Sequence, residues 1–196
     1  MSNIAIQGAA TGTGVFTLAS PATNTNRTLT LPDEAGTVLT TAGVPASAMP
    51  AGSVLQIAKG ESTTQVSVGT NQIYYTLYSF NVTAVGDNSR YVFNTYQHAY
   101  QTTDSLSSRA NLGYSVTIGG ATTRLAGVDG ASGDGWGQAA YPGTGLNRHH
   151  VWDSSVPAGT VITVNVLGVM WDVGTIYFNY AGHGLKGFCT VTEVSV

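Results

Sequence analysis

The chain is short of charged residues. Only 9% of its 196 residues are Asp, Glu, Lys or Arg, where about 25% is usual for a soluble domain. Its two lysines and five arginines are scattered and the formal net charge is −3, so no basic face for phosphate binding is expected. We therefore do not expect nucleic acid as a partner. A surface with so little electrostatic repulsion suits a protein that lives in an assembly.

Cysteine, signal-like segments and long apolar runs are equally scarce. Cys189 is the only cysteine, which excludes an internal disulfide and a thiolate metal cluster, and we expect it to be a small buried side chain. The start MSNIAIQGAA lacks the basic and apolar regions of a secretion signal, and no run reaches the 18 or so apolar residues of a membrane helix. We expect a protein made in a cytoplasm, with no membrane insertion and no cofactor.

Short runs of β-branched and aromatic residues recur about every ten residues, broken by Gly, Asn, Asp and Ser. This spacing is typical of an all-β sandwich or barrel, so the sequence predicts mainly antiparallel sheet. One helical candidate, residues 104–113, begins at an N-cap Asp and ends at a Gly, and a single turn or loop fits it equally well. The predicted strands cover residues 15–19, 28–31, 37–40, 53–58, 73–82, 90–96, 114–118, 161–170, 175–179 and 187–194.

Two of these strands have informative alternation. Residues 161–170 carry Ile162, Val164, Val166 and Met170 on one face and polar residues on the other, as in a half-buried core strand. Residues 73–82 are rich in apolar side chains on both faces. That pattern predicts cover on both sides, which a neighbouring subunit would supply.

The composition changes near residue 44. Residues 1–43 contain one aromatic residue and are too few to form an independent core, whereas 53–196 are predicted to form a β-sandwich head. Residues 44–52, VPASAMPAG, are predicted to be an extended connector. Since NRTLTLPDEAGTVLTT (26–41) is a Thr-rich hairpin with a thin apolar stripe, we expect copies from several chains to cover one another. The residues expected to make this assembly are Phe16, Leu18, Leu29, Leu31, Val38 and Leu39.

The stretch ATGTGVFTLASPATNTNRTLTLPDEAGTVLTT, residues 10–41, resembles a module of tail-fibre and other virion-surface proteins of bacteriophages, especially marine and cyanobacterial ones. The following PASAMPAGSVLQIAKG is similar to the passage from that module into the C-terminal domain of such proteins, and the segments after residue 155 are similar to their final strands. The resemblance implies a homotrimeric, non-enzymatic structural protein on the virion surface, with a jelly-roll-like head, made without a signal peptide. Its partners would be other tail or capsid proteins.

Three functions remain open at this point. A short tail or head fibre would display its head outward towards a host glycan or surface protein. A capsid decoration or cement protein would clamp neighbouring capsid subunits and need no host ligand. A polysaccharide-degrading tail enzyme would need paired carboxylates, but the chain is short for a tailspike β-helix and shows no repeat of that kind.

The richest collection of binding-type residues is predicted in a long loop, residues 127–153. Flat aromatic rings beside amide, guanidinium and imidazole groups suit recognition of a sugar or a protein epitope, and loops are where such residues collect. Packing of the same aromatics onto the sandwich or into a subunit interface is the interpretation that the sequence favours over binding, because Trp and Tyr are enriched in obligate interfaces as well. The candidate residues are Trp136, Tyr141, Asn147, Arg148, His149, His150 and Trp152.

The remaining motifs give weaker evidence for a binding site. GHGLKG, residues 182–187, fits G-x-G-x-x-G but opens no helix, so a hairpin loop is favoured over dinucleotide binding. DGASGDG, residues 129–135, lacks calcium-loop spacing. His149 and His150 are adjacent, and on a strand they would point to opposite faces, so we expect no metal there.

Overall fold

The computed structural model of the chain describes residues 44–69, 73–101, 109–126, 137–138, 143–171, 174–179 and 186–196. All of them belong to one compact unit, Leu39–Val196. The strands predicted at 15–19, 28–31 and 37–40 lie outside the described residues, and so do all six residues expected to make the assembly.

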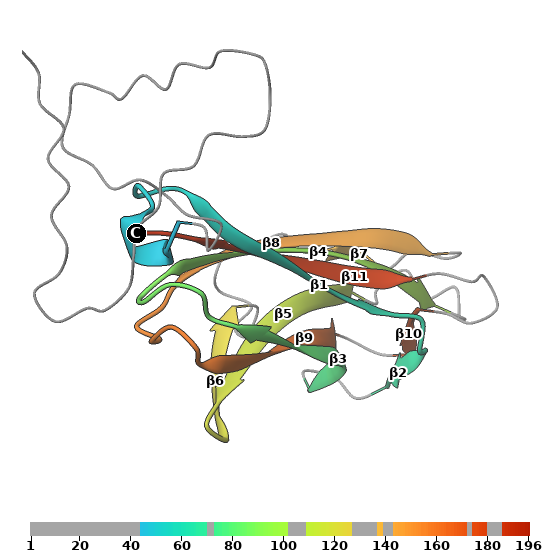
Figure 1. Cartoon of the computed structure of the whole chain (residues 1–196). Helices are drawn as coiled ribbons and strands as arrows, with labels where there is room; N and C mark the ends of the chain where they lie inside the picture. Colours follow the sequence, from blue (N-terminus) through green and yellow to red (C-terminus); the bar gives the residue numbers. More distant parts are fainter. Residues whose placement is uncertain are drawn as a thin grey trace, which may run out of the picture. The chain divides into compact units, whose positions relative to one another are not determined.

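The described part of the head is built from strands in two antiparallel sheets, which Figure 1 shows as two layers. The expected antiparallel β-sandwich is therefore confirmed. In chain order the elements are the 3-10 turn η1 (Ala46–Ala48) and strands β1 (Val54–Ser62), β2 (Val66–Val68), β3 (Tyr74–Thr83), β4 (Arg90–Gln101), β5 (Arg109–Ile118), β6 (Ala121–Ala126), β7 (Gly137–Gln138), β8 (Thr144–Asp153), β9 (Val161–Trp171), β10 (Ile176–Phe178) and β11 (Gly187–Val194).

Strand β4 organises the first sheet, which we call sheet A. Residues 90–96 of β4 pair with β11, residues 99–101 pair with β10, and β8 runs along residues 90–99. β1 adds to β11 and β2 adds to β10. Among the described residues β8 pairs with β4 alone and is therefore an edge strand of sheet A.

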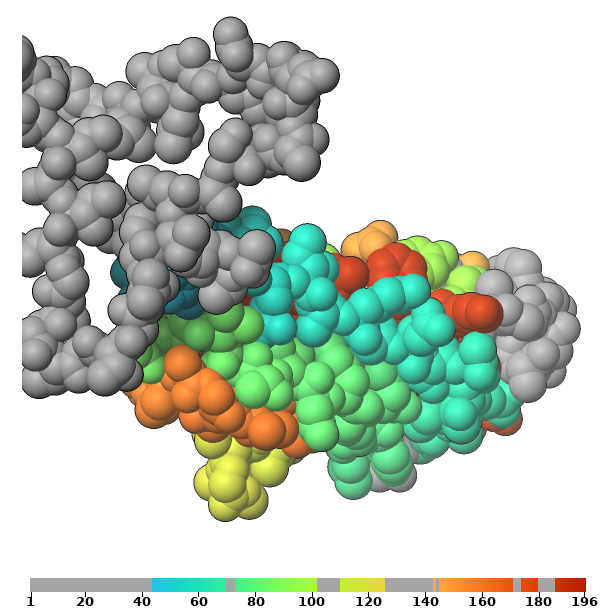
Figure 2. All heavy atoms as spheres, in the orientation of Figure 1, coloured from blue at the N-terminus to red at the C-terminus, as the bar shows by residue number. Residues whose placement is uncertain are grey.

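The second sheet, sheet B, has the order β3-β9-β5-β6, with β7 beside β5. Its outer face carries a polar ladder. Asn165 on β9 accepts a hydrogen bond from Ser79 on β3 at 2.7 Å and donates to Ser115 and Thr117 on β5, each at 3.2 Å. The turn that joins β5 to β6, coloured yellow, projects from the head in Figures 1 and 2. The side chains of the polar ladder thus satisfy one another's hydrogen-bonding groups on the outer face of sheet B.

The core lies between the sheets, where the alternation predicted for β9 is confirmed. Ile162, Val164, Val166 and Met170 are all buried in one cluster that also holds Phe93, Tyr114 and Phe178. Burial of such a side chain contributes about 1.5–3 kcal/mol each. Cys189 is fully buried in the same cluster, as expected.

Strand β3 corrects one expectation. Its register with β9 shifts between Thr76 and Tyr78, so a bulge brings Leu77 to the core side as well as Tyr78. Beyond the bulge Ser79 and Asn81 are exposed on the outer face. The apolar residues on both sequence faces therefore reflect this bulge, and the strand needs no second cover from a neighbouring subunit.

Two further segments differ from expectation. Within the helical candidate at 104–113, residues 109–113 are the start of strand β5, where Leu112 packs in the core, and burial of that apolar face outweighs the weak helix signals; residues 104–108 lie outside the described part. The predicted loop at 127–153 is also wrong over residues 144–153, which form the ten-residue strand β8.

The connector joins the head at one end of the sandwich, which we call the connector end. The Gly52 amide donates to the Ser195 carbonyl at 2.9 Å, the Ser195 amide donates to the Ser53 carbonyl at 2.9 Å, and the Ser195 hydroxyl donates to the Pro50 carbonyl at 2.6 Å. A turn, η1, lies within the connector, so it is not extended throughout as predicted. Its last residues are fixed to the C-terminal residues of the head (Figure 1).

The pairing registers place the remaining connections at one of two ends. The links at 84–89, 119–120 and 154–160 lie at the connector end, because β3, β5 and β8 finish there and β4, β6 and β9 begin there. Strands β1, β4 and β9 finish at the opposite end, which we call the loop end, and β3, β5, β8 and β11 begin there. The end of β4 at Gln101 and the start of β11 at Gly187 therefore lie at the loop end, away from the connector.

Buried Glu193 stabilises the connector end. Its carboxylate accepts hydrogen bonds from the Gly86 amide at 2.8 Å, the Val85 amide at 3.0 Å and the Gln56 side-chain amide at 2.5 Å. Burial acts to raise the pKa of this carboxyl, but the donated hydrogen bonds outweigh it and the pKa is lowered overall.

Candidate functional site

Strand β8 divides the predicted binding residues between two surfaces. Successive side chains of a strand point to opposite faces, so Arg148, His150 and Trp152 face sheet B, while Asn147 and His149 face outward. Adjacent histidines on opposite faces are what the sequence predicted for a strand. Trp136 and Tyr141, from the same predicted cluster, lie outside the described residues.

The inward residues of β8 pack in the sandwich. Arg148 is only 7% exposed, and its carbonyl accepts a hydrogen bond from the Tyr114 hydroxyl at 2.9 Å. The His150 ring lies 6.1 Å from the Tyr114 ring, and Trp152 stacks on Tyr91 at 5.4 Å. These three side chains fix β8 to the core and do not form an open binding surface.

The outward residues of β8 border a shallow pocket of about 280 Å³ on the outer face of sheet A, which we call the ring pocket. Asn147 pairs in register with Tyr96 of β4, and Tyr96 pairs with Phe188 of β11, so one row crosses three strands. The next row is His149, Asn94 and Thr190. The pocket is lined by Asn94, Thr95, Tyr96, Asn147, Arg148, His149 and Phe188.

Two aromatic rings form one wall of the ring pocket. The Tyr96 and Phe188 rings stack with centroids 5.7 Å apart and planes 26° apart, and Phe188 is 41% exposed. Tyr96 lies across β8 at Gly145, where a Cβ atom would come within 2.8 Å of the ring and its hydroxyl. The glycine therefore leaves the space that this ring position requires.

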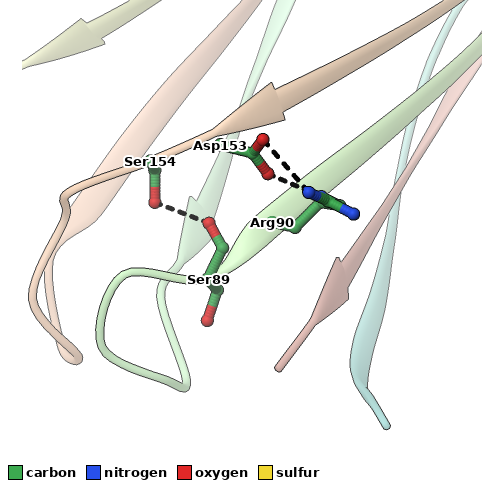
Figure 3. A network of polar contacts seen from close by, with 4 residues as sticks. All are labelled: Ser89, Arg90, Asp153 and Ser154. Carbon is green, nitrogen blue, oxygen red and sulfur yellow. Dashed lines mark hydrogen bonds and ion pairs between the residues drawn. The ribbon is translucent and has the colours of Figure 1, made fainter. Parts of the chain in front are cut away.

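A polar clamp at the connector end holds β8 in register with β4 (Figure 3). Arg90 donates to both carboxylate oxygens of Asp153, from Nε at 2.5 Å and from a terminal nitrogen at 3.1 Å. The Ser154 hydroxyl donates to the Ser89 carbonyl at 2.8 Å. The hydrogen bond from Arg90 lowers the pKa of Asp153. One register step further along the strand would exchange the inward and outward residues, so the clamp helps to define the ring pocket.

The sequence missed four residues of the ring pocket, namely Asn94, Thr95, Tyr96 and Phe188. The available signal was the segment RYVFNTYQHAY, in which aromatic residues occupy both faces of one strand. An aromatic residue on the outer face of a sheet is exposed without a packing reason, which favours a binding or interface role.

A second surface feature lies on sheet A towards the connector end. Ile57, Thr192, Val92 and Val151 form one register row across β1, β11, β4 and β8 on the outer face, and we call it the apolar row. Ile57 is 68% exposed and Val151 is 42% exposed. This contrasts with the polar ladder on the outer face of sheet B.

The buried thiol and tyrosine hydroxyl groups of the core have raised pKa values, which disfavours their ionised, nucleophilic forms. Burial raises the pKa of Cys189 to about 11, and burial also raises the pKa of Tyr78, Tyr91 and Tyr114. Within the described ranges no three His, Cys, Asp or Glu side chains are grouped so as to hold a metal ion. No helix among the described residues is long and apolar enough to cross a membrane. The described surface offers rings, amides and an imidazole, which are groups that bind.

Another hollow, of about 310 Å³, lies where the connector meets the head. Its walls come from the connector, the link at 84–89 and the last residues of the chain, including Met49, Leu55 and Val85. Asp87, which also lines it, accepts a hydrogen bond from the Ala158 amide at 2.7 Å. Of the polar residues in its lining, Asp87 and Ser195 are engaged in hydrogen bonds that hold the chain together at this end.

No protein-family model and no curated protein sequence matches the chain. A structure of infectious bursal disease virus, Gt strain, matches with a TM-score of 0.41 at 11% identity, covering 74% of this chain and 39% of that one. The VP2 subviral particle of infectious bursal disease virus matches with a TM-score of 0.37 at 11% identity, over 72% of this chain and 40% of that one.

The CBM22-1 xylan-binding domain of Paenibacillus barcinonensis Xyn10C matches with a TM-score of 0.35 at 12% identity, over 76% of this chain and 99% of the domain. This chain spans about two fifths of the viral chains that it matches. At these values the likeness carries no assignment of function. None of these neighbours is a tail-fibre protein, and the tail-fibre resemblance of residues 10–57 stays a prediction.

Proposed function

We propose that the protein is a structural protein of a bacteriophage virion, a short homotrimeric fibre of the tail or the head. Residues 1–43 attach and trimerise it, and the β-sandwich is displayed on the virion surface, where it contacts the host. The resemblance of residues 10–57 supports the virion location. The low content of charged residues supports life in an assembly.

The observation that best supports outward display of the head is that the connector is attached to one end of it. Four hydrogen bonds link Pro50, Gly52 and Ser53 to Ser195, so the head is held at one end. Strands β1, β4 and β9 end at the loop end, opposite this attachment, and β3, β5, β8 and β11 begin there. A head held by its connector end leaves the loop end and the outer face of sheet A open to a partner, which suits a surface fibre.

Symmetry-resolved electron density of purified particles of the phage that encodes the chain tests this proposal. We expect threefold projections at the tail or at isolated capsid vertices, with the sandwich outermost. Seating of the chain flat across the capsid lattice would overturn the fibre proposal in favour of a decoration protein, and absence from purified particles would overturn a virion role.

Light scattering of the purified full-length chain tests the oligomeric state separately. Each chain has a mass of 20.2 kDa, so a homotrimer has three times that mass. A monomer at micromolar concentration would contradict the expected role of residues 1–43.

A further inference from the structure

We propose that the ring pocket on the outer face of sheet A binds an uncharged sugar. The role of such binding in host recognition rests on the proposed function, but the binding itself is a property of the purified chain. Among the described residues, strands β4, β8 and β11 form this binding surface.

The first argument is the exposed pair of rings. Phe188 is 41% exposed on a strand whose opposite face supplies the buried Cys189 and Val191, so its exposure does not result from a lack of core. Its stacking partner Tyr96 lies over Gly145. The apolar C–H face of a sugar ring packs on an aromatic ring held open in this way, and Phe and Tyr provide much area at a low cost in conformational entropy.

The second argument is the set of polar groups around the rings. Asn94, Asn147 and His149 are all exposed and reach the same pocket from two neighbouring strands. Side-chain amides both donate and accept hydrogen bonds, and imidazole does so in its neutral form. Sugar hydroxyls need both kinds of partner, and a few convergent polar groups beside apolar area are typical of small-ligand sites.

The third argument is charge. The lining of the pocket contains no carboxylate, and its guanidinium group belongs to Arg148, which is only 7% exposed. The charged residues nearest in register lie on β1, where Lys59 pairs with Thr190 and Glu61 pairs with Phe188, and their side chains pair with each other at 2.8 Å. Because the neighbouring charges pair with each other and no exposed ammonium or guanidinium group lines the pocket, this balance favours an uncharged ligand over one that carries a phosphate, sulfate or carboxylate group.

A second copy of the chain is the competing occupant of this face. The exposed aliphatic side chains that favour a subunit contact lie in the apolar row towards the connector end, whereas the ring pocket lies further along the sheet and mixes rings with amides. The apolar row adjoins the row that contains Thr190, Asn94 and His149, which borders the pocket, but the apolar row and the pocket lining share no residue. A subunit contact confined to the apolar row would therefore involve none of the residues that line the pocket.

The test is titration of the purified full-length chain by calorimetry and saturation-transfer NMR. The probes are neutral oligosaccharides of glucose, galactose, mannose, rhamnose and N-acetylglucosamine, with sialyllactose and a sulfated heparin tetrasaccharide as charged comparisons. We expect at least one neutral probe to bind with a dissociation constant of about 1 mM or tighter. The charged probes should not bind more tightly than the neutral ones.

Three variants locate the binding. Phe188→Ala and Asn147→Ala should each weaken the bound probe about tenfold or more, which corresponds to one stacking contact or hydrogen bond. Gly145→Ala should also weaken it, because the new Cβ displaces the Tyr96 ring while every ligand-binding group remains. The matched control is Ile57→Ala, which removes exposed apolar area from the same face outside the pocket and should leave affinity within about twofold.

The outcomes are distinct from those of the virion test. The proposal is overturned if no neutral probe binds at about 10 mM, ten times the expected dissociation constant. It is also overturned if a charged probe binds more tightly than every neutral one. Binding that survives both Phe188→Ala and Asn147→Ala overturns it too, as does a loss of trimer in Phe188→Ala at unchanged fold, which would make this face a subunit interface. None of these results would alter where the chain sits on a particle.

Discussion

Replacement of Glu193 by Gln should weaken the connector end of the head. The carboxylate is fully buried and accepts hydrogen bonds from three groups, the amides of Val85 and Gly86 and the side chain of Gln56. In Glu193→Gln one oxygen remains for the two backbone amides, but the other becomes a donor that faces the Gln56 NH₂ group. The variant therefore loses one charge-assisted hydrogen bond and weakens two others.

The expected cost is about 2–4 kcal/mol, because a hydrogen bond to a charged group contributes about 1.5–3 kcal/mol and the backbone pair is only partly lost. Urea unfolding of the full-length chain at pH 7, followed by fluorescence, measures it. With a slope of about 1–3 kcal/mol per molar urea, the midpoint should fall by about 1–2 M. The control is Glu61→Gln, whose carboxylate is exposed and pairs with Lys59, and which should leave the midpoint unchanged.

The pH dependence gives an independent check. The pKa of Glu193 in the folded protein is lowered below the ordinary value of 4.5. The stabilisation is therefore complete above pH 4.5 and is lost as the pH falls from there through the folded pKa, because the unfolded chain takes up the proton first. Wild type should thus lose more stability than Glu193→Gln in this acid range. Equal stability of the two proteins at pH 7, or parallel acid profiles, would refute the reasoning.

Three further predictions concern packing, the thiol and assembly. Gly60→Ala places a Cβ against the Phe80 ring and should cost about 1–3 kcal/mol in urea unfolding, whereas Gly69→Ala meets only ordinary contacts and should not. Cys189, with its pKa raised to about 11, should react with a disulfide reagent at pH 8 only after unfolding, and immediate reaction would contradict its burial. Ile57→Asp in the apolar row should reduce the trimer fraction in light scattering while Val161→Asp, 51% exposed on sheet B, should not; equal effects would show that the row is not a subunit contact.

Most core strands were predictable because apolar and polar residues alternate along them in the sequence. β9 alternates Ile162, Val164 and Val166 with polar residues, and β11 was predicted with its observed bounds. β8 was missed because its inward positions hold Arg148 and His150, polar residue types that hide the alternation. The bulge in β3 was also invisible, because a register shift depends on the partner strand.

The candidate site was predictable only in part, for a related reason. Asn147 and His149 were singled out from their own segment, and the structure places them at the ring pocket. Their neighbours Tyr96 and Phe188 come from about 50 residues earlier and 40 later in the chain, and only the order of strands brings the three segments together. Sequence spacing carries no information on that order.

The position of the ring pocket on strands has a consequence for affinity. A site on loops loses conformational entropy when it becomes ordered around a ligand, whereas Asn147 and His149 are set by a strand whose other face packs on the core through Arg148 and His150. The polar residues that obscured β8 in the sequence are thus the ones that preorganise its outward face. Even so, a shallow pocket of about 280 Å³ takes only a small ligand unit, so one head should bind weakly. In a homotrimer three such heads would share one attachment, and multivalency would supply the remaining affinity without further contacts.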